Sequence, residues 1–168
     1  LTHPILQAPM AGGGDTPALV AAVGEAGGIG FVGAAYLTPE IIKINASAIR
    51  ARTNGPFAIN LFIGTDDPAP THAEIAYTCD ILRPWAEAYG VEPPSAPSAP
   101  IALDRQIEAM LEVCPPVFSF TFGLASEDLL SACRSRHILT MGTATTLEEV
   151  VALEQSGVDC ICVQGMEA

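Results

Sequence analysis

A regular alternation of short apolar runs with amphipathic segments constrains the fold of this chain more than any other feature. The apolar runs are predicted to be strands, and they lie at residues 5–8, 29–33, 57–62, 116–120, 137–141 and 159–164. In the segments between them, apolar residues recur at the three- and four-residue spacing of an α-helix. Because the runs are continuously apolar, they are typical of strands that other layers cover on both faces. The alternation therefore predicts an α/β fold with a parallel sheet and helical crossovers.

Several predicted helices begin with a hydroxyl residue that can cap the first turn. Thr16 precedes Pro17, which combines an N-cap with a proline at the first helical position. Thr145 and Glu148 have the spacing of a capping box. Two further helices are predicted from about residue 71 to 89 and from about residue 103 to 113. Nearly every connection between strands thus contains a helix, as parallel pairing requires.

The length of 168 residues is enough for one domain with a sizeable core, so we expect residues 1–168 to form a single domain. The segment 91–100, VEPPSAPSAP, is rich in proline and cannot be a regular helix or a central strand. We predict an extended surface excursion or insertion there. The residues alone leave two architectures open, an open doubly wound sheet and most of a (β/α)8 barrel, because both consist of βα units.

Composition limits the partners and the compartment. The net charge of −12 repels phosphate backbones, so we expect no nucleic acid partner. No apolar run reaches the roughly 18 residues needed to span a bilayer, so we expect no membrane partner. The five cysteines are scattered, so we predict reduced thiols and a cytoplasmic location. Cys160 and Cys162 lack CxxC spacing, and we predict that these two are buried as small hydrophobic residues. The chain begins with Leu1 rather than methionine, and it has six predicted strands where a closed barrel has eight, which suggests a partial chain.

The loops that follow the predicted strands carry amides, hydroxyls, small side chains and two methionines. Both candidate architectures bring these loops to one edge of the sheet, where ligands bind. The loops contain no carboxylate pair, no His–Cys–Asp group and no metal-ligand spacing, so neither hydrolysis nor a metal site is predicted. They suit a large planar cofactor whose polar edges are bound by Asn60 and Gln164.

Five segments of the chain resemble the nitronate monooxygenase family, which is also known as 2-nitropropane dioxygenase. They are PILQAPMAGG, LVAAVGEAGGIGFVGAAYLTPE, PFAINLF, VFSFTFG and GTATTLEEVVALEQSGVDCICVQGMEA. The resemblance covers nearly the whole chain except residues 91–100. It implies an FMN-binding TIM (β/α)8-type barrel, of which this chain would hold about six of the eight βα units. It also implies oxidation of alkyl nitronates or nitroalkanes by O2 without a metal, with a homodimer as one possible assembly.

The resemblance also implies site residues. The family positions that contact FMN fall on Pro9, Met10, Ala11, Asn60, Phe62, Met141, Gln164 and Gly165. The catalytic base of the family is a histidine in the loop after the sixth strand, and it is expected beyond Ala168, so no catalytic residue is named in this chain. The chain departs from the family at Thr121, where relatives often have histidine, and at Met141, where some have lysine.

Two alternatives to a nitronate monooxygenase-like oxidoreductase stay open at this point. The family includes FMN-dependent enoyl-ACP reductases, which would use NAD(P)H and an enoyl thioester. An inactive truncated barrel fragment that binds no flavin is the other.

Overall fold

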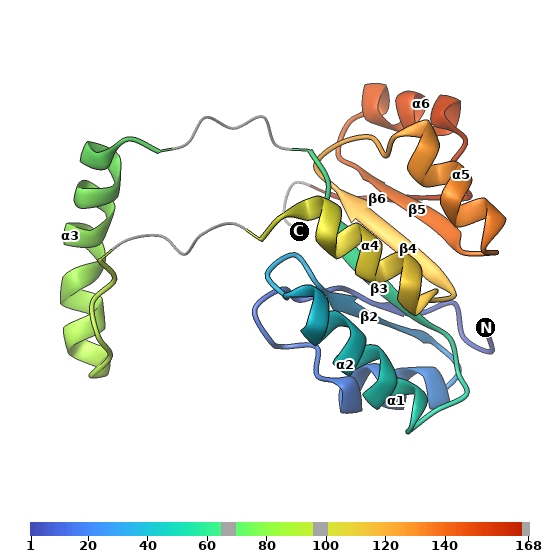
Figure 1. Cartoon of the computed structure of the whole chain (residues 1–168), viewed down its shortest axis with the longest axis horizontal. Coiled ribbons are helices and arrows are strands. Elements are labelled where there is room, and N and C mark those ends of the chain that lie inside the picture. Colours follow the sequence, from blue (N-terminus) through green and yellow to red (C-terminus); the bar gives the residue numbers. More distant parts are fainter. Residues whose placement is uncertain (65–69, 96–100, 166–168) are drawn as a thin grey trace. The chain divides into compact units, whose positions relative to one another are not determined.

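Six parallel strands form the sheet of the computed structural model (Figure 1). The structure describes residues 1–64, 70–95 and 101–165. The strands are β1 (Leu6–Gln7), β2 (Ile29–Gly33), β3 (Phe57–Phe62), β4 (Val117–Thr121), β5 (Leu139–Ala144) and β6 (Cys160–Val163). The helices are α1 (Pro17–Glu25), α2 (Pro39–Arg50), α3 (His72–Tyr89), α4 (Leu103–Val113), α5 (Glu127–Ser135) and α6 (Leu147–Ser156).

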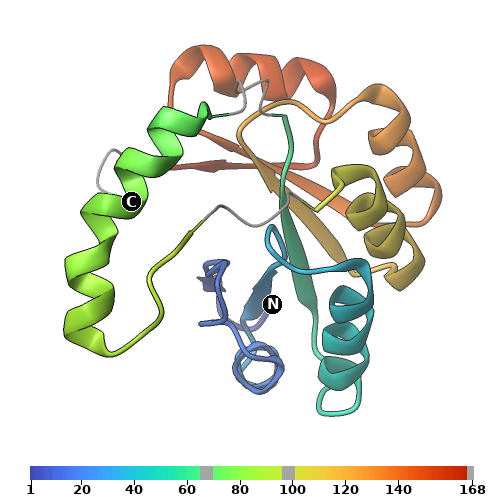
Figure 2. The same ribbon diagram turned by 60° about the vertical axis from the view of Figure 1, so that its left-hand side comes forward.

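The strand order decides between the two architectures. Each strand pairs with the next one along the chain, in the order β1-β2-β3-β4-β5-β6. Right-handed crossovers that advance in one direction place their helices on the same face of a sheet. Accordingly, α1, α2, α4, α5 and α6 lie on one side of the curved sheet (Figures 1 and 2). A doubly wound sheet would reverse its strand order and carry helices on both faces, so this sheet is singly wound, like a (β/α)8 barrel.

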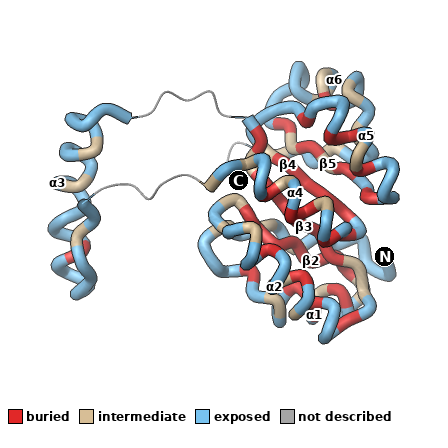
Figure 3. Tube along the Cα trace, viewed as in Figure 1, coloured by how far each residue is buried: buried red, intermediate tan, exposed pale blue. Residues whose placement is uncertain are grey.

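Apolar side chains cover both faces of the sheet, because successive residues of a strand point to opposite sides. On the helical side, Ile59 and Phe118 belong to a large cluster with helix residues such as Met110. On the opposite, concave side, Phe31 and Val117 belong to a smaller cluster with Ile29, Ala58 and the partly buried Met141. Figure 3 shows buried residues along the central strands and on the helix faces that meet them. The strands are continuously apolar in the sequence because both faces of the sheet are covered.

The helix starts confirm the predicted cap at Thr16 and correct the one at Thr145. The hydroxyl of Thr16 accepts a hydrogen bond from Leu19 N, and Pro17 occupies the first turn. The capping box of α6, however, consists of Thr146 and Glu149 rather than Thr145 and Glu148. The reason is that β5 continues to Ala144, which shifts the first helical residue to Leu147.

The predicted strand at 137–141 lies too early in the chain. The N–H groups of His137 and Ile138 donate to carbonyls of α5 at 3.1 and 3.0 Å, and His137 has a left-handed φ of 57°. These two residues therefore end the helix, and β5 begins at Leu139. The small residues after Met141 continue the pairing with β6, so Met141 lies within a strand and not in the loop after it. At β1, only Leu6 and Gln7 of the predicted 5–8 are paired.

The prediction that Cys160 and Cys162 are buried is wrong, since both are exposed. Of the other cysteines, Cys133 lies on the buried face of α5, Cys114 is exposed and Cys79 is half-buried. Cys160 and Cys162 lie on β6, which pairs only with β5 in the part of the chain that the structure describes. An edge strand leaves its side chains open to solvent.

Residues 66–100 form a second compact unit, whose described part is α3 and the residues around it. Thr71 and Glu74 make a capping box, and α3 ends at Gly90, whose φ of 64° is left-handed. The predicted helix from about 71 to 89 is confirmed. Residues 91–95 of the proline-rich segment are neither helix nor strand, and residues 96–100 lie outside the described residues.

Candidate functional site

A cavity of about 930 Å³ opens at the edge where the carboxyl ends of the parallel strands meet. Small-molecule and cofactor sites have volumes of about 300–1,000 Å³. Six of the eight residues predicted to contact a cofactor line this cavity, namely Pro9, Ala11, Asn60, Phe62, Gln164 and Gly165. The fold thus brings together the loops after β1 and β6 and the carboxyl end of β3, which lie far apart in the sequence.

The carboxylate of Asp15 holds the loop after β1 against β2. This residue is 6% exposed, and its Oδ2 accepts hydrogen bonds from the backbone N–H of Met10, at 2.9 Å, and of Gly33. The approach is close, since a Cβ on Gly33 would lie 2.6 Å from the backbone nitrogen of Ala11. Hydrogen bonds to an ionised acceptor are about twice as strong as neutral ones. Asp15 was not predicted as a site residue from the sequence. The one feature that could have indicated it is its position as an acidic residue between a glycine-rich turn and a helix cap.

The two predicted methionines do not line the cavity. Met10 is 40% exposed, and its side chain packs over Gly14, where a Cβ would lie 3.3 Å from Met10 Cβ and 3.4 Å from the sulfur. Met141 packs in the small apolar cluster on the concave face. The cavity wall is built instead by the residues on either side of Met10 and by Thr143, two residues after Met141.

A buried amide and a hydroxyl pair across β3 and β4. Asn60 is 2% exposed, and its Nδ2 donates a 2.8 Å hydrogen bond to Oγ of Ser119, which lies directly opposite in the strand register. This bond orients the amide of Asn60. The amide retains a carbonyl acceptor and a second N–H, which can bind a ligand in the cavity that Asn60 lines.

Two residues further along these strands, Phe62 lies opposite Thr121. The ring of Phe62 packs edge-on against Phe122, with 4.8 Å between centroids, and against Tyr36, with 6.0 Å. Phe122 has a left-handed φ of 67°, a conformation that costs a non-glycine residue about 1–2 kcal/mol. Among the side chains that the structure describes, Oγ1 of Thr121 is buried without a hydrogen-bond partner. A strained aromatic residue beside an unpaired hydroxyl is typical of a functional site.

The wall near β6 is fixed by backbone pairing and by a helix cap. The N–H of Gln164 donates to the carbonyl of Ala144 at 2.8 Å, which extends the ladder one residue past β6. Glu149 also lines the cavity, and its pKa is lowered chiefly by a hydrogen bond from the backbone N–H of Thr145 and then by one from the Thr145 hydroxyl. Glu149 therefore caps α6 as an anion and is not a candidate proton donor.

The described lining contains no histidine, lysine or arginine. Within residues 1–64, 70–95 and 101–165, no group of three or more His, Cys, Asp or Glu residues could hold a metal ion. Over the same ranges, no helix is both long enough and apolar enough to cross a membrane. The polar groups of this cavity are amides, hydroxyls, the carboxylates of Glu148 and Glu149 and the thiol of Cys162, and they lie beside apolar surface.

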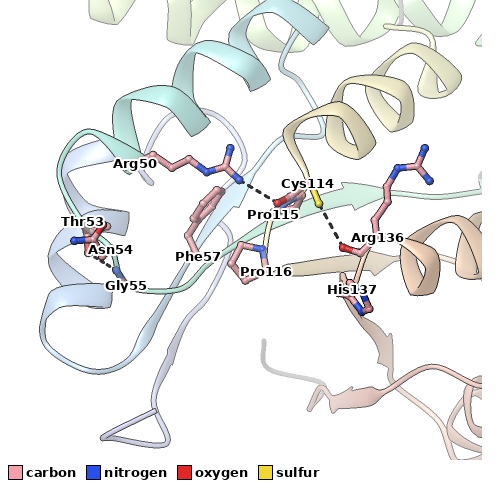
Figure 4. Close-up of a pocket in the computed structure, with 10 residues that line it drawn as sticks. All are labelled: Arg50, Thr53, Asn54, Gly55, Phe57, Cys114, Pro115, Pro116, Arg136 and His137. Atoms are coloured by element: carbon pink, nitrogen blue, oxygen red, sulfur yellow. Dashed lines mark hydrogen bonds between the residues drawn. The ribbon is translucent and has the colours of Figure 1, made fainter.

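A second cleft, of about 440 Å³, lies at the opposite edge of the sheet and is lined by the residues labelled in Figure 4. Two of them are arginines. Nη2 of Arg50 donates to the carbonyls of Val113 and Cys114 at 2.8 and 3.0 Å, and Nη1 of Arg136 donates to the carbonyl of Ala132 at 3.0 Å. These carbonyls belong to the C-terminal turns of α4 and α5, which lack backbone partners of their own. The cations at this edge therefore stabilise helix ends.

Sequence comparisons agree with the geometry. A model of the nitronate monooxygenase family matches residues 1–168. A protein of Staphylococcus saprophyticus described as a probable nitronate monooxygenase is 34% identical over 167 residues, covering 99% of this chain and 46% of the relative. A protein of Staphylococcus aureus (strain Newman) with the same description is 33% identical over 172 residues, covering 100% of this chain and 47% of the relative. The chain thus spans about half the length of the curated relatives it matches.

Comparison with solved structures supports the same assignment. A nitroalkane oxidase from Streptomyces ansochromogenes superimposes with a TM-score of 0.84 at 36% identity, covering 98% of this chain and 47% of that one. FabK from Thermotoga maritima shares the fold, with a TM-score of 0.71 at 24% identity, covering 99% of this chain and 42% of that one. The predicted α/β barrel of the TIM type, with six of its eight βα units in this chain, is confirmed. Since the family match extends over all 168 residues, the chain belongs to the nitronate monooxygenase family.

Proposed function

We propose that the protein containing this chain is an FMN-dependent oxidoreductase that oxidises alkyl nitronates with O2. The cavity at the carboxyl edge carries the proposal, because six of the residues at which the family resemblance implies cofactor contacts converge there. The descriptions of the Staphylococcus relatives and of the Streptomyces nitroalkane oxidase also support it.

The residues present fit a flat cofactor with polar edges. At Gly33 of β2, the backbone of Ala11 in the loop after β1 comes closer than any side chain would allow. The amides of Asn60 and Gln164 offer donors and acceptors for a flavin ring, and Phe62 offers an apolar contact. The hydroxyl of Thr121 has no hydrogen-bond partner among the described residues, which supports a lining with hydrogen-bonding capacity for a ligand.

Each predicted contact has a specific role in this proposal. Pro9, Ala11, Asn60, Phe62, Gln164 and Gly165 would contact FMN directly. Met10 would act through its backbone, which Asp15 holds in place, and Met141 would support the concave face beneath the site. When bound, FMN supplies the electron-transfer chemistry that no side chain in the cavity can provide.

In the proposal, the residues of this chain bind and orient the cofactor. The rings of Phe62 and Phe122 give the cavity an apolar face, and Phe122 is 64% exposed. The described lining holds no histidine, and of its two carboxylates Glu149 is engaged in the cap of α6. In the proposal, the base is the family histidine expected beyond Ala168.

The remaining parts of the proposal concern the setting. All five cysteines are free thiols, which supports a reducing compartment such as the cytoplasm. The small-molecule substrate and O2 are the expected partners. The homodimer remains a prediction, which light scattering on the full-length protein would test.

The decisive experiment uses the full-length protein reconstituted with FMN. We expect one bound FMN per chain, measured by release and fluorescence, and O2 uptake with propyl-1-nitronate. Neutral 1-nitropropane in parallel shows whether the anion or the neutral form is oxidised. A protein that retains no FMN, or one that retains FMN but consumes no O2 with the nitronate, refutes the proposal. NADH oxidation with an enoyl thioester in the latter case would favour the reductase alternative.

A further inference from the structure

The hydroxyl of Thr121 lies at the carboxyl end of β4 and lines the carboxyl-edge cavity. It shares the concave face of its strand with Ser119, whose hydroxyl accepts a bond from Asn60. Thr121 Oγ1 itself is buried and has no partner among the described side chains. A buried hydroxyl without a hydrogen bond costs about 1–3 kcal/mol, so its retention at a cavity wall indicates a partner supplied by a ligand.

The surroundings of this hydroxyl are apolar. Phe62 lies directly opposite on β3, and Phe122 follows next in the chain. Both rings line the cavity, as does Leu124. Phe122 keeps its left-handed backbone, which presents its ring 4.8 Å from that of Phe62. The result is a hydroxyl donor beside an apolar wall that is open to solvent on one side, since Phe122 is 64% and Leu124 53% exposed.

This arrangement differs from the amide-rich parts of the same cavity. The polar edge of a flavin ring needs several donors and acceptors in one plane, and the amides of Asn60 and Gln164 meet that need. A single hydroxyl beside aromatic rings instead matches a small ligand that has an anionic oxygen at one end and an alkyl chain at the other. An alkyl nitronate has this shape and charge.

We infer that Thr121 binds the substrate: its hydroxyl donates a hydrogen bond to an oxygen of the nitronate group, and the wall formed by Phe62, Phe122 and Leu124 contacts the alkyl chain. This assignment rests on the proposed function and makes it specific, because it names the group that holds the anionic head and the surface that selects the tail.

The test uses the full-length FMN-loaded protein with ethylnitronate, propyl-1-nitronate and hexyl-1-nitronate as probes. Thr121→Val removes the O–H group at nearly constant volume, and Thr121→Ser is the matched control that keeps it. A hydrogen bond to a charged group corresponds to a change in binding of about 10- to 100-fold. We therefore expect Thr121→Val to raise KM by that factor for all three nitronates, and Thr121→Ser to stay near the wild type. The Kd for FMN, measured by fluorescence titration of the FMN-free protein, is expected to be unchanged in both variants.

Phe122→Ala tests the apolar wall separately. Burial of one methylene group is worth up to about a fourfold change in binding. The KM of Phe122→Ala is therefore expected to exceed that of the wild type increasingly from ethylnitronate to hexyl-1-nitronate, with the Kd for FMN unchanged. An equal effect on all three probes would overturn the placement of the alkyl chain.

The possible failures are distinguishable. A wild-type protein that turns over no nitronate refutes the proposed function, and the substrate assignment fails with it. If the wild type is active and Thr121→Val weakens FMN binding with KM unchanged, the hydroxyl serves the cofactor and this inference is wrong. If Thr121→Val changes neither constant, or if Thr121→Ser is as impaired as Thr121→Val, the hydroxyl does not bind the substrate.

Discussion

Removal of the Asp15 carboxylate is the sharpest test of how the β1 loop is held. Its Oδ2 accepts hydrogen bonds from the backbone of Met10 and Gly33, and the residue is 6% exposed. Each hydrogen bond to a charged group contributes about 1.5–3 kcal/mol, and removal of the acceptor leaves both N–H groups unpaired. Because two bonds from one group are not additive, we expect Asp15→Ala to lower the free energy of unfolding by about 3 kcal/mol. In Asp15→Asn a neutral oxygen can replace the acceptor, so about half of that loss is expected.

The assay combines urea unfolding with FMN titration of the full-length protein. If release of the loop leaves its binding-competent arrangement about one-tenth populated, the Kd for FMN in Asp15→Ala rises about tenfold. Asp159→Ala is the matched control, since its Oδ2 also accepts two hydrogen bonds, both from Thr140 at 2.8 Å, but at the opposite edge of the sheet. Asp159 is exposed, so we expect a smaller loss of stability and an unchanged Kd for FMN. An Asp15→Ala variant with wild-type stability and wild-type FMN affinity would refute the clamp.

Three further predictions concern single residues. In Gly33→Ala the new Cβ would lie 2.6 Å from the backbone nitrogen of Ala11, so we expect weaker FMN binding by titration, with no gain from the added methyl group. Hydrogen bonds from Thr145 lower the folded-state pKa of Glu149. The contribution of Glu149 to stability is therefore present above about pH 4.5 and is lost as the pH falls through the lowered pKa. We expect Glu149→Gln to flatten this part of the plot of urea midpoint against pH. Burial raises the pKa of the Cys133 thiol to about 11. We therefore expect iodoacetamide at pH 8 to modify the exposed thiols of the folded protein and to leave Cys133 unmodified, as read by mass spectrometry. Rapid labelling of Cys133 would contradict its burial.

Local signals in the sequence predicted most elements well. The strands at 29–33 and 57–62 and the helix at 103–113 have the predicted bounds, because uninterrupted apolar runs and helical periodicity are properties of neighbouring residues. The errors fall where an end depends on a partner. The start of β5 was placed too early because the N–H groups of His137 and Ile138 bind carbonyls of α5, a choice that the apolar run HILTM does not encode. The shifted capping box of α6 follows from the same error, since β5 continues to Ala144.

For the candidate site, the family resemblance pointed to the loops and the tertiary structure sorted their residues. Asn60 and Gln164 reach the cavity because they lie at the carboxyl ends of parallel strands, which a strand prediction already implies. Met141 does not, because its position within β5 puts its side chain into the apolar cluster on the concave face. Thr121 was noted only as a departure from the family, and its unpaired hydroxyl emerges from the described structure alone. Asp15 was missed, because its clamp depends on Gly33, 18 residues away.

The sequence by itself determined the α/β class, the cap of α1 at Thr16, the set of small and amide residues at the strand ends, and the family. These depend on composition, spacing and local hydrogen bonding, which a linear chain displays directly. Only the tertiary structure decided that the strands are singly wound in sequential order, that Asp15 joins the β1 loop to β2, and that the Thr121 hydroxyl lies unpaired beside the rings of Phe62 and Phe122. These features depend on which distant segments become neighbours, and that is settled by the packing of the whole sheet against its helices.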